Sequence, residues 1–533
     1  MSLSLTEQAD RRRTFAIISH PDAGKTTLTE NLLLAGGAIR AAGEVAARGQ
    51  RRRTTSDWMK IERDRGISVS ASVMTFEYQG NVYNLLDTPG HEDFSEDTYR
   101  TLTAADCAIM VLDAAKGIEP QTLKLFEVCR MRDIPIITFI NKLDREALDP
   151  LELLDEVADK LQLDTAPLYW PAGSGNRFGG MVDMRTGDYL PYFKQPNDAP
   201  IVPGLCKRVA LDDVRQQLDP VAISELEEGS ELAAEALPKM DRDAFLEGHM
   251  TPVVFGTALR HFGVGELLAT LEEFAPAPRP QKAHRKDAPI ELVRDAKEVS
   301  GFVFKIQANM DPNHRDRVAF LRLCSGEFKR GMRMKTMSGK QLNIHNPLMF
   351  LAQDREIAET AYAGDVIGVP NHGQLRVGDS LSESGDIKFA GIPNFAPEIL
   401  RRARSKDPMK AKHLRKALES LAEEGVTQLF KPSIGSDMIV GAVGALQIEV
   451  MAERMVSEYN LDVIFEPAPY NVARWISCDD EAKIEAFLDK NKSASGTDLD
   501  GAPVYLAKNS WDVGYAAEKN PDIRFTATKE RAV

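Results

Sequence analysis

The sequence predicts an α/β domain that carries an inserted subdomain, followed by a β-barrel domain and an α+β C-terminal domain. Its 533 residues leave room for about three domains at roughly 100 to 200 residues each. From Thr14 to about Leu163, short apolar runs alternate with helical patterns, as in βαβ units with a mainly parallel sheet. After a proline-rich connector, short alternating segments with Gly-containing turns are typical of an antiparallel barrel. The expected domains span residues 1–280, with an insertion at about 160–250, then residues 295–390 and 391–533.

The first domain is expected to contain buried strands separated by amphipathic helices. Helical patterns cover residues 26–37, which end in a glycine pair, and residues 120–133, which begin with a proline. Residues 73–87 resemble a hairpin that turns at 79–81, so we expect one antiparallel edge strand. The apolar runs that we interpret as strands are residues 15–19, 83–88, 107–114 and 134–141.

The expected insertion is strongly acidic. The alternation of strands and helices breaks after about Leu163 and resumes with the strand pattern at 251–259 and a helix at 263–274. Residues 211–247 hold eleven acidic and three basic residues, so they contribute −8 to the net charge of −14. A net negative charge argues against a protein that binds nucleic acid uniformly through phosphate neutralisation. Any contact with nucleic acid must therefore be local.

The C-terminal part mixes helical and strand patterns. Residues 401–416 form a basic amphipathic pattern that we interpret as helical, and a second helix is expected at 414–425. Short strand patterns at 438–444, 461–466 and 473–478 complete a compact α+β domain. The residues beyond these patterns, at the end of the chain, have no clear assignment.

Cysteine usage and apolar runs indicate a cytoplasmic protein. The five cysteines are scattered and never spaced as C-x-x-C, which argues against a disulfide framework and a zinc site. The apolar run from Cys107 to Ala115 is interrupted by Asp113, whereas a membrane span needs about 20 apolar residues. The N-terminal residues lack the apolar segment of a signal peptide. We therefore expect neither export nor membrane insertion.

A phosphate-binding loop is expected directly after the first strand. In such a loop, backbone N–H groups and a helix N terminus hold phosphates, a lysine reaches the β and γ oxygens, and a hydroxyl binds Mg²⁺. Lys25 and Thr26 fit the last two roles, although Ser19 replaces the first glycine of the strict pattern. An ordinary strand-to-helix turn is the alternative. The expected phosphate-binding residues are Ser19, His20, Pro21, Asp22, Ala23, Gly24, Lys25, Thr26 and Thr27.

Three further loops follow predicted strands. A carboxylate at Asp87 can hold Mg²⁺ through water, and Gly90 can turn its N–H toward a γ-phosphate. Asp144 can accept hydrogen bonds from guanine N1–H and the 2-amino group, which adenine lacks. For such a tetrapeptide taken alone, a plain polar turn with a hydrogen-bonded Asp is the better interpretation. The expected nucleotide-binding residues of these loops are Asp87, Thr88, Pro89, Gly90, Asn141, Lys142, Leu143, Asp144, Gly256, Thr257 and Ala258.

The order of the four loops favours a GTPase domain over four unrelated turns. Each loop follows a predicted strand in this sequence order, and a chance coincidence of all four is improbable. The sequence therefore predicts an α/β P-loop GTPase domain that binds GTP or GDP with Mg²⁺. A P-loop ATPase or kinase remains an alternative, against which the guanine-reading Asp144 argues.

Longer segments carry a more specific likeness. Residues 19–33, 56–74, 84–102, 301–322 and 391–398 resemble the bacterial peptide chain release factor three family of translational GTPases. The resemblance extends from about Arg11 to Trp475. It includes a histidine, His91, directly after the Asp87–Gly90 loop, as translational GTPases have.

The resemblance implies roles for several residues. His91 would be the catalytic residue that orients the attacking water, and Pro21 and Ile67 would form an apolar gate that holds it away. A switch I loop at 40–69 would place the Ser68 hydroxyl on the metal, so the expected metal-binding residues are Thr26, Ser68 and Asp87. His20 is expected to be structural and to hydrogen-bond to the backbone of its own loop.

The family likeness also implies a role in translation termination. A ribosome-stimulated GTPase would promote departure of the codon-reading release factors from the ribosome after peptide release. The implied partners are those release factors and the rRNA and proteins of both ribosomal subunits, with no membrane partner and a monomeric chain. The alternatives are another ribosomal GTPase of the translocation or rescue type, against which residues 309–317 argue, and a binding switch that hydrolyses too slowly to be an enzyme.

Two basic clusters are candidate RNA contacts. Residues 401–416 hold eight Lys or Arg and one Asp, and Arg48, Arg51, Arg52 and Arg53 lie within the expected switch I loop. Such patches neutralise RNA phosphates locally even when the overall charge is negative. A solvated basic surface is the alternative for both clusters. The acidic insertion could likewise repel RNA, meet a basic ribosomal protein or be a solvated helical cap.

Overall fold

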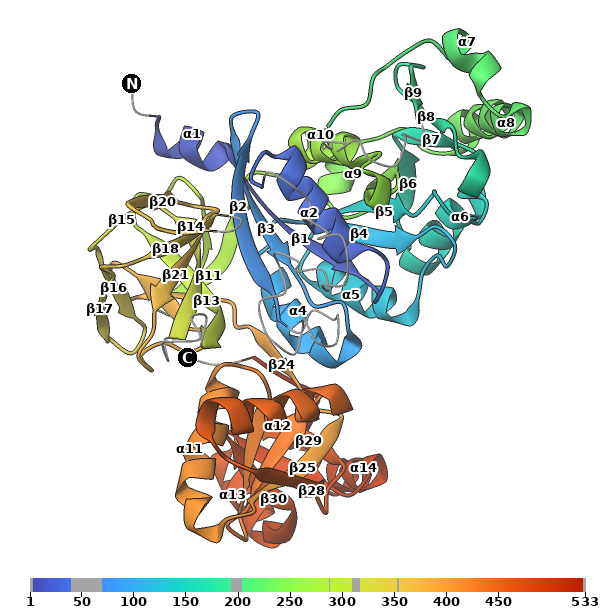
Figure 1. The fold of residues 1–533 in the computed structure, drawn as a ribbon. Helices are drawn as coiled ribbons and strands as arrows, with labels where there is room; N and C mark the ends of the chain where they lie inside the picture. Colours follow the sequence, from blue (N-terminus) through green and yellow to red (C-terminus); the bar gives the residue numbers. More distant parts are fainter. Residues whose placement is uncertain are drawn as a thin grey trace.

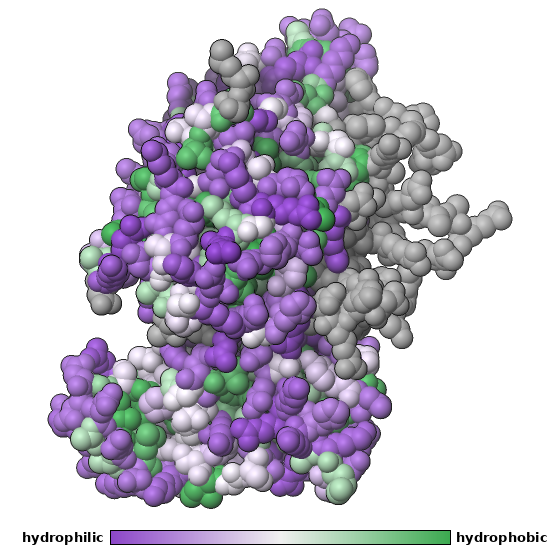
Figure 2. All heavy atoms as spheres, turned by 90° about the vertical axis from the view of Figure 1, so that its left-hand side faces the viewer, coloured by the Kyte–Doolittle hydropathy of each residue, from purple (hydrophilic) through white to green (hydrophobic). Residues whose placement is uncertain are grey.

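The computed structural model describes residues 3–39, 70–192, 204–286, 288–308, 317–351 and 354–530. Figure 1 shows an α/β part in blue and green, a β-rich part in yellow beside it, and an α+β part in orange and red below both. Viewed from the side of the β-rich part, the surface is mainly hydrophilic with scattered apolar residues (Figure 2). In the described part of the chain, no helix is long and apolar enough to cross a membrane.

The first part is built on a mainly parallel sheet. Its strand order is β2-β3-β1-β4-β5-β10-β6, and β2 alone runs antiparallel to its neighbour β3. The hairpin between β2 and β3 turns at Gln79 and Gly80, whose φ angles of 49° and 81° match the twist of the strands. The strands are β1 (Arg12–Ser19), β2 (Ser72–Tyr78), β3 (Asn81–Asp87), β4 (Cys107–Asp113), β5 (Ile136–Asn141), β6 (Asp164–Pro167) and β10 (Met250–Phe255).

Helices cover both faces of this sheet, as the predicted βαβ pattern requires. Phe15 and Ile17 of β1 pack in one apolar cluster with α2 and α10, whereas Ala16 and Ile18 pack in another with α4 and α5. This alternation buries both faces of β1, so its sequence is a continuous apolar run. The helices are α1 (Leu5–Asp10), α2 (Lys25–Ala35), η1 (Glu92–Phe94), α4 (Ser95–Leu102), α5 (Pro120–Met131), α6 (Pro150–Leu161), η4 (Ala258–Arg260) and α10 (Val264–Phe274).

The insertion forms a small layer of its own beside the sheet. It contains a three-stranded antiparallel sheet, against which α8 packs with Ala222, Ile223 and Leu226. The expected insertion at 160–250 also includes β6, but this strand pairs with β10 in the main sheet. The separate layer therefore starts only at Tyr169. Its elements are β7 (Tyr169–Ala172), η2 (Gly175–Arg177), β8 (Gly180–Asp183), β9 (Tyr189–Pro191), α7 (Leu211–Val214), η3 (Arg215–Gln217), α8 (Pro220–Ala236) and α9 (Arg242–Leu246).

The second part consists of short, mostly antiparallel strands that dock on the first part. Leu351 of β18 pairs with Thr75 of β2, so the sheets are continuous. The buried Arg12 lies 2.8 Å from Asp365 across this junction. The strands are β11 (Gln281–Arg285), β12 (Ala288–Leu292), β13 (Ser300–Ala308), β14 (Arg317–Ser325), β15 (Glu327–Lys329), β16 (Arg333–Thr336), β17 (Gln341–Asn343), β18 (Leu348–Leu351), β19 (Asp354–Ile357), β20 (Thr360–Tyr362), β21 (Val366–Pro370), β22 (Ser380–Ser382) and β23 (Ile387–Phe389).

The third part is an α+β structure with an eight-stranded sheet of order β28-β25-β27-β26-β30-β31-β29-β32. Leu418 and Leu421 of α11 and Met451 and Met455 of α12 pack in one core. The elements are β24 (Pro393–Phe395), β25 (Ile399–Ser405), η5 (Pro408–Lys410), α11 (Ala411–Glu423), β26 (Gln428–Pro432), β27 (Met438–Ala442), α12 (Ala445–Tyr459), β28 (Val463–Pro467), β29 (Val472–Ser477), α13 (Glu481–Lys490), η6 (Lys492–Ala494), β30 (Ser495–Asp498), β31 (Pro503–Ala507), α14 (Ser510–Lys519), β32 (Arg524–Thr526) and β33 (Thr528–Glu530).

One prediction for this part is wrong. The first residues of the basic segment 401–416 belong to strand β25 and not to a helix. Strand β25 pairs with β27 on one side and β28 on the other, with Leu400 and Ala403 buried. Pairing on both edges of a strand depends on distant segments, and it overrides a local helical pattern. The helix expected at 414–425 is present as α11.

Candidate active site

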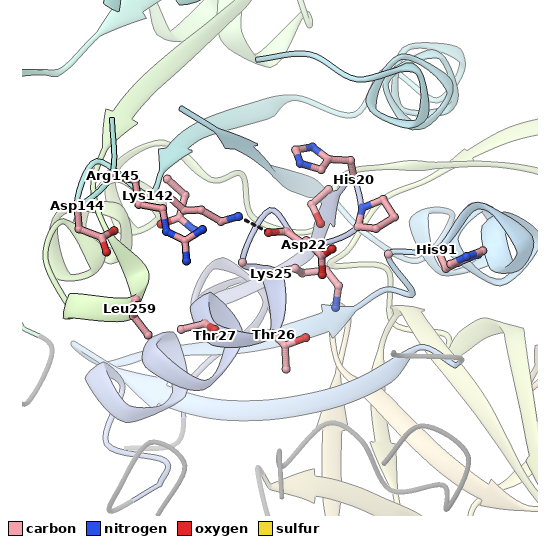
Figure 3. Close-up of a pocket in the computed structure, with 15 residues that line it drawn as sticks. His20, Asp22, Lys25, Thr26, Thr27, His91, Lys142, Asp144, Arg145 and Leu259 are labelled. Carbon is pink, nitrogen blue, oxygen red and sulfur yellow. Dashed lines mark hydrogen bonds between the residues drawn. The ribbon is translucent and has the colours of Figure 1, made fainter. Parts of the chain in front are cut away.

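A cavity of ≈650 Å³ lies at the carboxyl ends of β1 and β5. It brings together residues from three of the four predicted loops, which are distant in sequence (Figure 3). Open α/β sheets bind ligands at this edge because loops from neighbouring strands converge there. The lining residues are Ser19, His20, Pro21, Asp22, Gly24, Lys25, Thr26, Thr27, Gly90, His91, Asn141, Lys142, Asp144, Arg145 and Leu259.

The first loop connects β1 to the N terminus of α2. Gly24 occupies the N-cap position of α2 with a φ of 99°, and an added Cβ would lie 2.3 Å from the Asn141 amide nitrogen. Both the backbone angle and the space thus require glycine. The first N–H groups of a helix have no partner within it, and at the start of α2 they belong to residues that line the cavity. These groups and the helix dipole favour an anionic ligand.

Lys25 pairs with Asp87 beneath the cavity. Its Nζ lies 2.6 Å from Oδ1 of Asp87, which also accepts a hydrogen bond of 3.2 Å from the Thr29 hydroxyl. Asp87 ends β3 and is almost fully buried, so it lies behind Lys25 and does not line the cavity.

Thr26, the residue of α2 that follows Lys25, does line the cavity. Two of the three residues predicted to bind metal thus lie on neighbouring elements, and Ser68 lies outside the described residues.

Asn141 connects the loops at the other end of the cavity. Its Nδ2 donates to the Ala23 carbonyl and its Oδ1 accepts from the Ala258 backbone N–H, both at 2.8 Å. The Asp144 Oδ1 accepts a 2.6 Å hydrogen bond from the Thr257 hydroxyl. These bonds join the first loop, the Asn141–Asp144 loop and the Gly256–Ala258 loop into one rigid frame. Asp144 itself lines the cavity (Figure 3).

Lys142 ties this frame to β4. Its Nζ donates to Asp113 Oδ2 at 2.7 Å and to the Asp22 carbonyl. Burial, the largest single influence, would raise the pKa of Asp113, but the hydrogen bonds from Lys142 and from the Ala115 backbone N–H, together with the charge of Lys142, outweigh burial and lower that pKa. Lys142 therefore carries a paired charge and holds the first loop in place.

The remaining predicted residues lie behind the cavity. Ala23, Leu143 and Ala258 are buried, and the Thr88 hydroxyl donates to the Ile17 carbonyl at 2.6 Å. Such residues shape the site through their backbone. Pro89 and Gly256 complete this set. The Pro89 carbonyl accepts a hydrogen bond from the Thr98 hydroxyl, and an added Cβ on Gly256 would lie 2.8 Å from the Phe139 ring.

The two histidines of the site have different surroundings. The buried ring of His20 has Nε2 at 2.9 Å from Oε2 of Glu119, which precedes α5. The ring thus faces the loop before α5, whereas we expected a hydrogen bond to the backbone of its own loop. Burial lowers the pKa of His20, although the negative charge of Glu119 acts in the opposite direction. His91 is about one-third exposed (35%) and forms the N-cap of η1. Figure 3 shows it beyond Lys25, with the ring directed away from the first loop.

Two lining residues escaped the sequence analysis. Arg145 and Leu259 directly follow the Asn141–Asp144 and Gly256–Ala258 loops, and both border the cavity beside Asp144 (Figure 3). Their position directly after two predicted loops could have suggested them. An arginine or a leucine at such a position, however, is not specific to a nucleotide-binding site. The exposed Leu259 offers an apolar surface at this end of the cavity.

Comparisons with known proteins agree with this architecture. Residues 10–277 match the family model of the elongation factor Tu GTP binding domain, and residues 298–384 match that of elongation factor G domain 2. Residues 389–517 match the model of the class II release factor RF3, C-terminal domain. A crystal structure of a protein from Thermus thermophilus is 25% identical, with a TM-score of 0.67 over 91% of this chain and 72% of that chain.

Proposed function

The chain belongs to the elongation factor Tu GTP binding domain family, and we propose that it promotes departure of codon-reading release factors from the ribosome after peptide release. It is a translational GTPase with a release factor RF3 C-terminal domain. The observation that carries this proposal is the match of residues 389–517, because this domain distinguishes the chain from other GTPases of translation. The GTPase cycle would set its affinity for the terminating ribosome. We also propose that it acts as a cytoplasmic monomer.

In the proposed site, the first loop holds the phosphates of GTP. The N–H groups at the start of α2 bind phosphate oxygens, and Lys25 exchanges its bond to Asp87 for the β and γ oxygens. Oxygen ligands suit Mg²⁺, and Thr26, Asp87 and Ser68 offer only such ligands. When bound, Mg²⁺ would neutralise phosphate charge. Lys25 and the N–H groups at the start of α2 would bind the phosphates from the same side and so orient the nucleotide in the cavity.

Asp144 is proposed to select guanine. A carboxylate accepts from both N1–H and the 2-amino group, whereas adenine offers neither donor at these positions. The Thr257 hydroxyl fixes the carboxylate, and Leu259 lines the same end of the cavity. This arrangement supports a site that binds GTP and GDP but not ATP.

His91 is proposed to orient the attacking water once its ring turns toward the γ-phosphate. Phosphoryl transfer depends mainly on positioning and charge stabilisation, so orientation is a sufficient role for the ring. Arg145 lies beside Asp144, at the end of the cavity that is proposed to hold the guanine base, and away from Lys25 of the first loop (Figure 3). The stimulus for hydrolysis is proposed to come from the ribosome, as the likeness to translational GTPases implies. Pro21 lines the cavity, and Ile67, its proposed partner in the gate, lies outside the described residues.

Part of the basic segment is available for a ribosomal partner. Arg404 pairs with Asp437 at 2.9 Å and Lys406 with Asp462 at 2.7 Å, so their charges are balanced within the protein. Lys412 and Lys416 are exposed on α11. We propose that these two lysines contribute to an rRNA contact, with a solvated basic surface as the alternative. Arg48, Arg51, Arg52 and Arg53 lie outside the described residues.

A termination assay tests the proposed function. Ribosomes are stalled at a stop codon with a labelled release factor bound, and its dissociation is followed after addition of this protein with GTP or GDP. We expect acceleration by the wild type with GTP and, if hydrolysis is required, little by His91→Ala. A dissociation rate that does not change with the wild type and GTP would overturn the termination role and leave the GTPase assignment intact.

The match of residues 298–384 to elongation factor G domain 2 supports a second candidate, a translocation or rescue GTPase. Movement of tRNA and mRNA in a translocation assay would favour that function. We expect no movement.

A further inference from the structure

The segment that carries His91 is attached to the C-terminal domain through Asp93. The backbone N–H of Asp93 donates to Nδ1 of His91 at 3.2 Å, and Oδ1 of Asp93 lies 3.7 Å from the same nitrogen. The other carboxylate oxygen, Oδ2, accepts a 2.7 Å hydrogen bond from the backbone N–H of Leu446. Asp93 thus contacts the ring of His91 with one end and the first turn of α12 with the other.

This contact gives α12 a cap from another domain. The N-cap residue of α12 is Gly444, which has no side chain, so the carboxylate of Asp93 takes the place of a capping residue. An added Cβ on Gly444 would lie 1.9 Å from Cγ of Asp93. Because the φ of Gly444 is −139°, any residue could adopt this backbone. Glycine is required here for space, and that space is filled by Asp93.

Three further contacts hold the following helix α4 against the same domain. Arg100 donates to the Gly425 carbonyl at 2.6 Å, and Glu96 accepts from the Gln428 side chain at 3.1 Å. The rings of Tyr99 and Phe395 pack edge to face at 4.9 Å. Figure 1 shows α4 directly above α12 and β24. The docked C-terminal domain therefore fixes the whole segment from η1 to α4.

The position of His91 follows from this fixation. Its Nδ1 accepts from the Asp93 N–H and its ring packs edge to face against Phe94 at 6.2 Å, which keeps the ring on the η1 side. In Figure 3 the ring points away from Lys25. His91 borders the cavity, and for its ring to turn toward Lys25 it must leave the N–H of Asp93, a residue that the bond from Leu446 holds against α12.

We propose that Asp93 is a positioning residue that couples His91 to docking of the C-terminal domain, and that the bond from Leu446 to Asp93 holds His91 away from the nucleotide until that domain shifts. The inference rests on the proposed role of His91 in hydrolysis. A capping bond of this kind biases the equilibrium between the two ring positions without any contact to the nucleotide. Loss of this bond increases the fraction of molecules in which the ring of His91 turns toward the nucleotide.

The test is GTP hydrolysis by the full chain without ribosomes. Asp93→Ala removes the acceptor, and Gly444→Ala displaces it from the other domain, so each should raise kcat by about three- to tenfold. The affinity for GTP should stay unchanged, because neither residue lines the cavity. Asp93→Asn retains an oxygen acceptor and should behave nearly as the wild type. The matched control is Gly514→Ala in α14, where an added Cβ meets nothing within 4 Å.

Double variants link the effect to the ring. Combined with His91→Ala, both Asp93→Ala and Gly444→Ala should lose their gain in kcat. Wild-type rates in both single variants, or a gain that survives His91→Ala, would overturn the coupling. If Asp93→Ala fails to fold, Gly444→Ala alone decides. A ribosome-stimulated rate that His91→Ala leaves unchanged would instead overturn the proposed role of His91, so the two failures are distinguishable.

Discussion

The Lys25 ammonium group lies 2.6 Å from the Asp87 carboxylate, and both side chains are buried. The pair joins the start of α2 to the end of β3, so it connects the proposed phosphate site to the segment that leads to His91. Two buried charges of opposite sign compensate each other only as a pair. A nucleotide that attracts Lys25 must therefore also change the surroundings of Asp87.

Replacing Lys25 by alanine should destabilise the nucleotide-free protein. The change leaves the Asp87 carboxylate buried without its counter-charge, which costs about 2–4 kcal/mol of the free energy of unfolding. The Lys25→Ala/Asp87→Ala double variant should lose less than the sum of the two single losses. Urea-induced unfolding measures all three values, and strict additivity would show that the two charges are not coupled.

Replacing Asn141 by alanine should loosen the frame around the cavity. The Ala23 carbonyl and the Ala258 N–H would both lose a buried partner, at about 2–4 kcal/mol in total. Asn141→Asp keeps the acceptor for Ala258 but places a carboxylate against the Ala23 carbonyl at an almost fully buried position, so its loss should be at least as large. Urea unfolding and GTP titration check both variants. A clearly smaller loss for Asn141→Asp would show that the bond to Ala23 contributes little.

Replacing Asp144 by asparagine should change base specificity. An asparagine cannot accept from both guanine donors, but its NH₂ can donate to the 2-carbonyl of xanthine, so affinity should shift from GTP toward XTP by more than about a hundredfold. The asparagine oxygen can still accept from the Thr257 hydroxyl, so the loop should keep its position. Competition binding with GTP, XTP and ATP measures the shift. Unchanged preference for GTP would remove Asp144 from the base site.

Gly425→Ala should weaken the docking of α4 on the C-terminal domain. Gly425 has a φ of +80°, and an added Cβ would lie 2.0 Å from Nη1 of Arg100. We expect a loss of about 2–3 kcal/mol in the free energy of unfolding from strain and displacement of Arg100 together. Gly435→Ala is the matched control, since its φ is +101° and nothing lies within 4 Å of an added Cβ. It should lose only about 1 kcal/mol, and equal losses would contradict the role of Arg100.

Glu266→Gln should alter the pH dependence of stability. Burial raises the pKa of Glu266 above its ordinary value of 4.5, and the Cys206 N–H donates to the carboxyl at 2.6 Å. A raised pKa means that the stabilising contribution is complete below pH 4.5 and is lost as the pH rises through the folded-state pKa. Glutamine does not titrate, so thermal midpoints of the wild type should fall relative to the variant over this range. Parallel pH profiles would contradict the assignment.

Much of the first part of the chain could be predicted from local patterns. Residues 26–37 were expected to be helical and form α2 from Lys25 to Ala35, and the hairpin turn falls at Gln79 and Gly80 as expected. The four loops also follow the strands that were predicted. Apolar periodicity and turn residues report the conformation of neighbouring residues, so they locate such elements well.

Contacts between distant residues were not predictable in this way. The basic residues at the start of 401–416 form β25 because β27 and β28 flank them, and the ring of His20 faces Glu119, 99 positions away in the sequence. Arg145 and Leu259 line the cavity through the way the loops meet. No local pattern contains this information.

The sequence by itself therefore determined which loops are the candidates for phosphate and guanine binding, because each motif depends on a few neighbouring residues after a strand. The tertiary structure decided how these loops are held and what controls them. Asn141 bonds to two other loops, and Asp93 caps a helix that begins more than 350 residues later. Such bonds form only when folding brings distant segments together, and the physical reason is that a hydrogen bond depends on separation in space and not on separation along the chain.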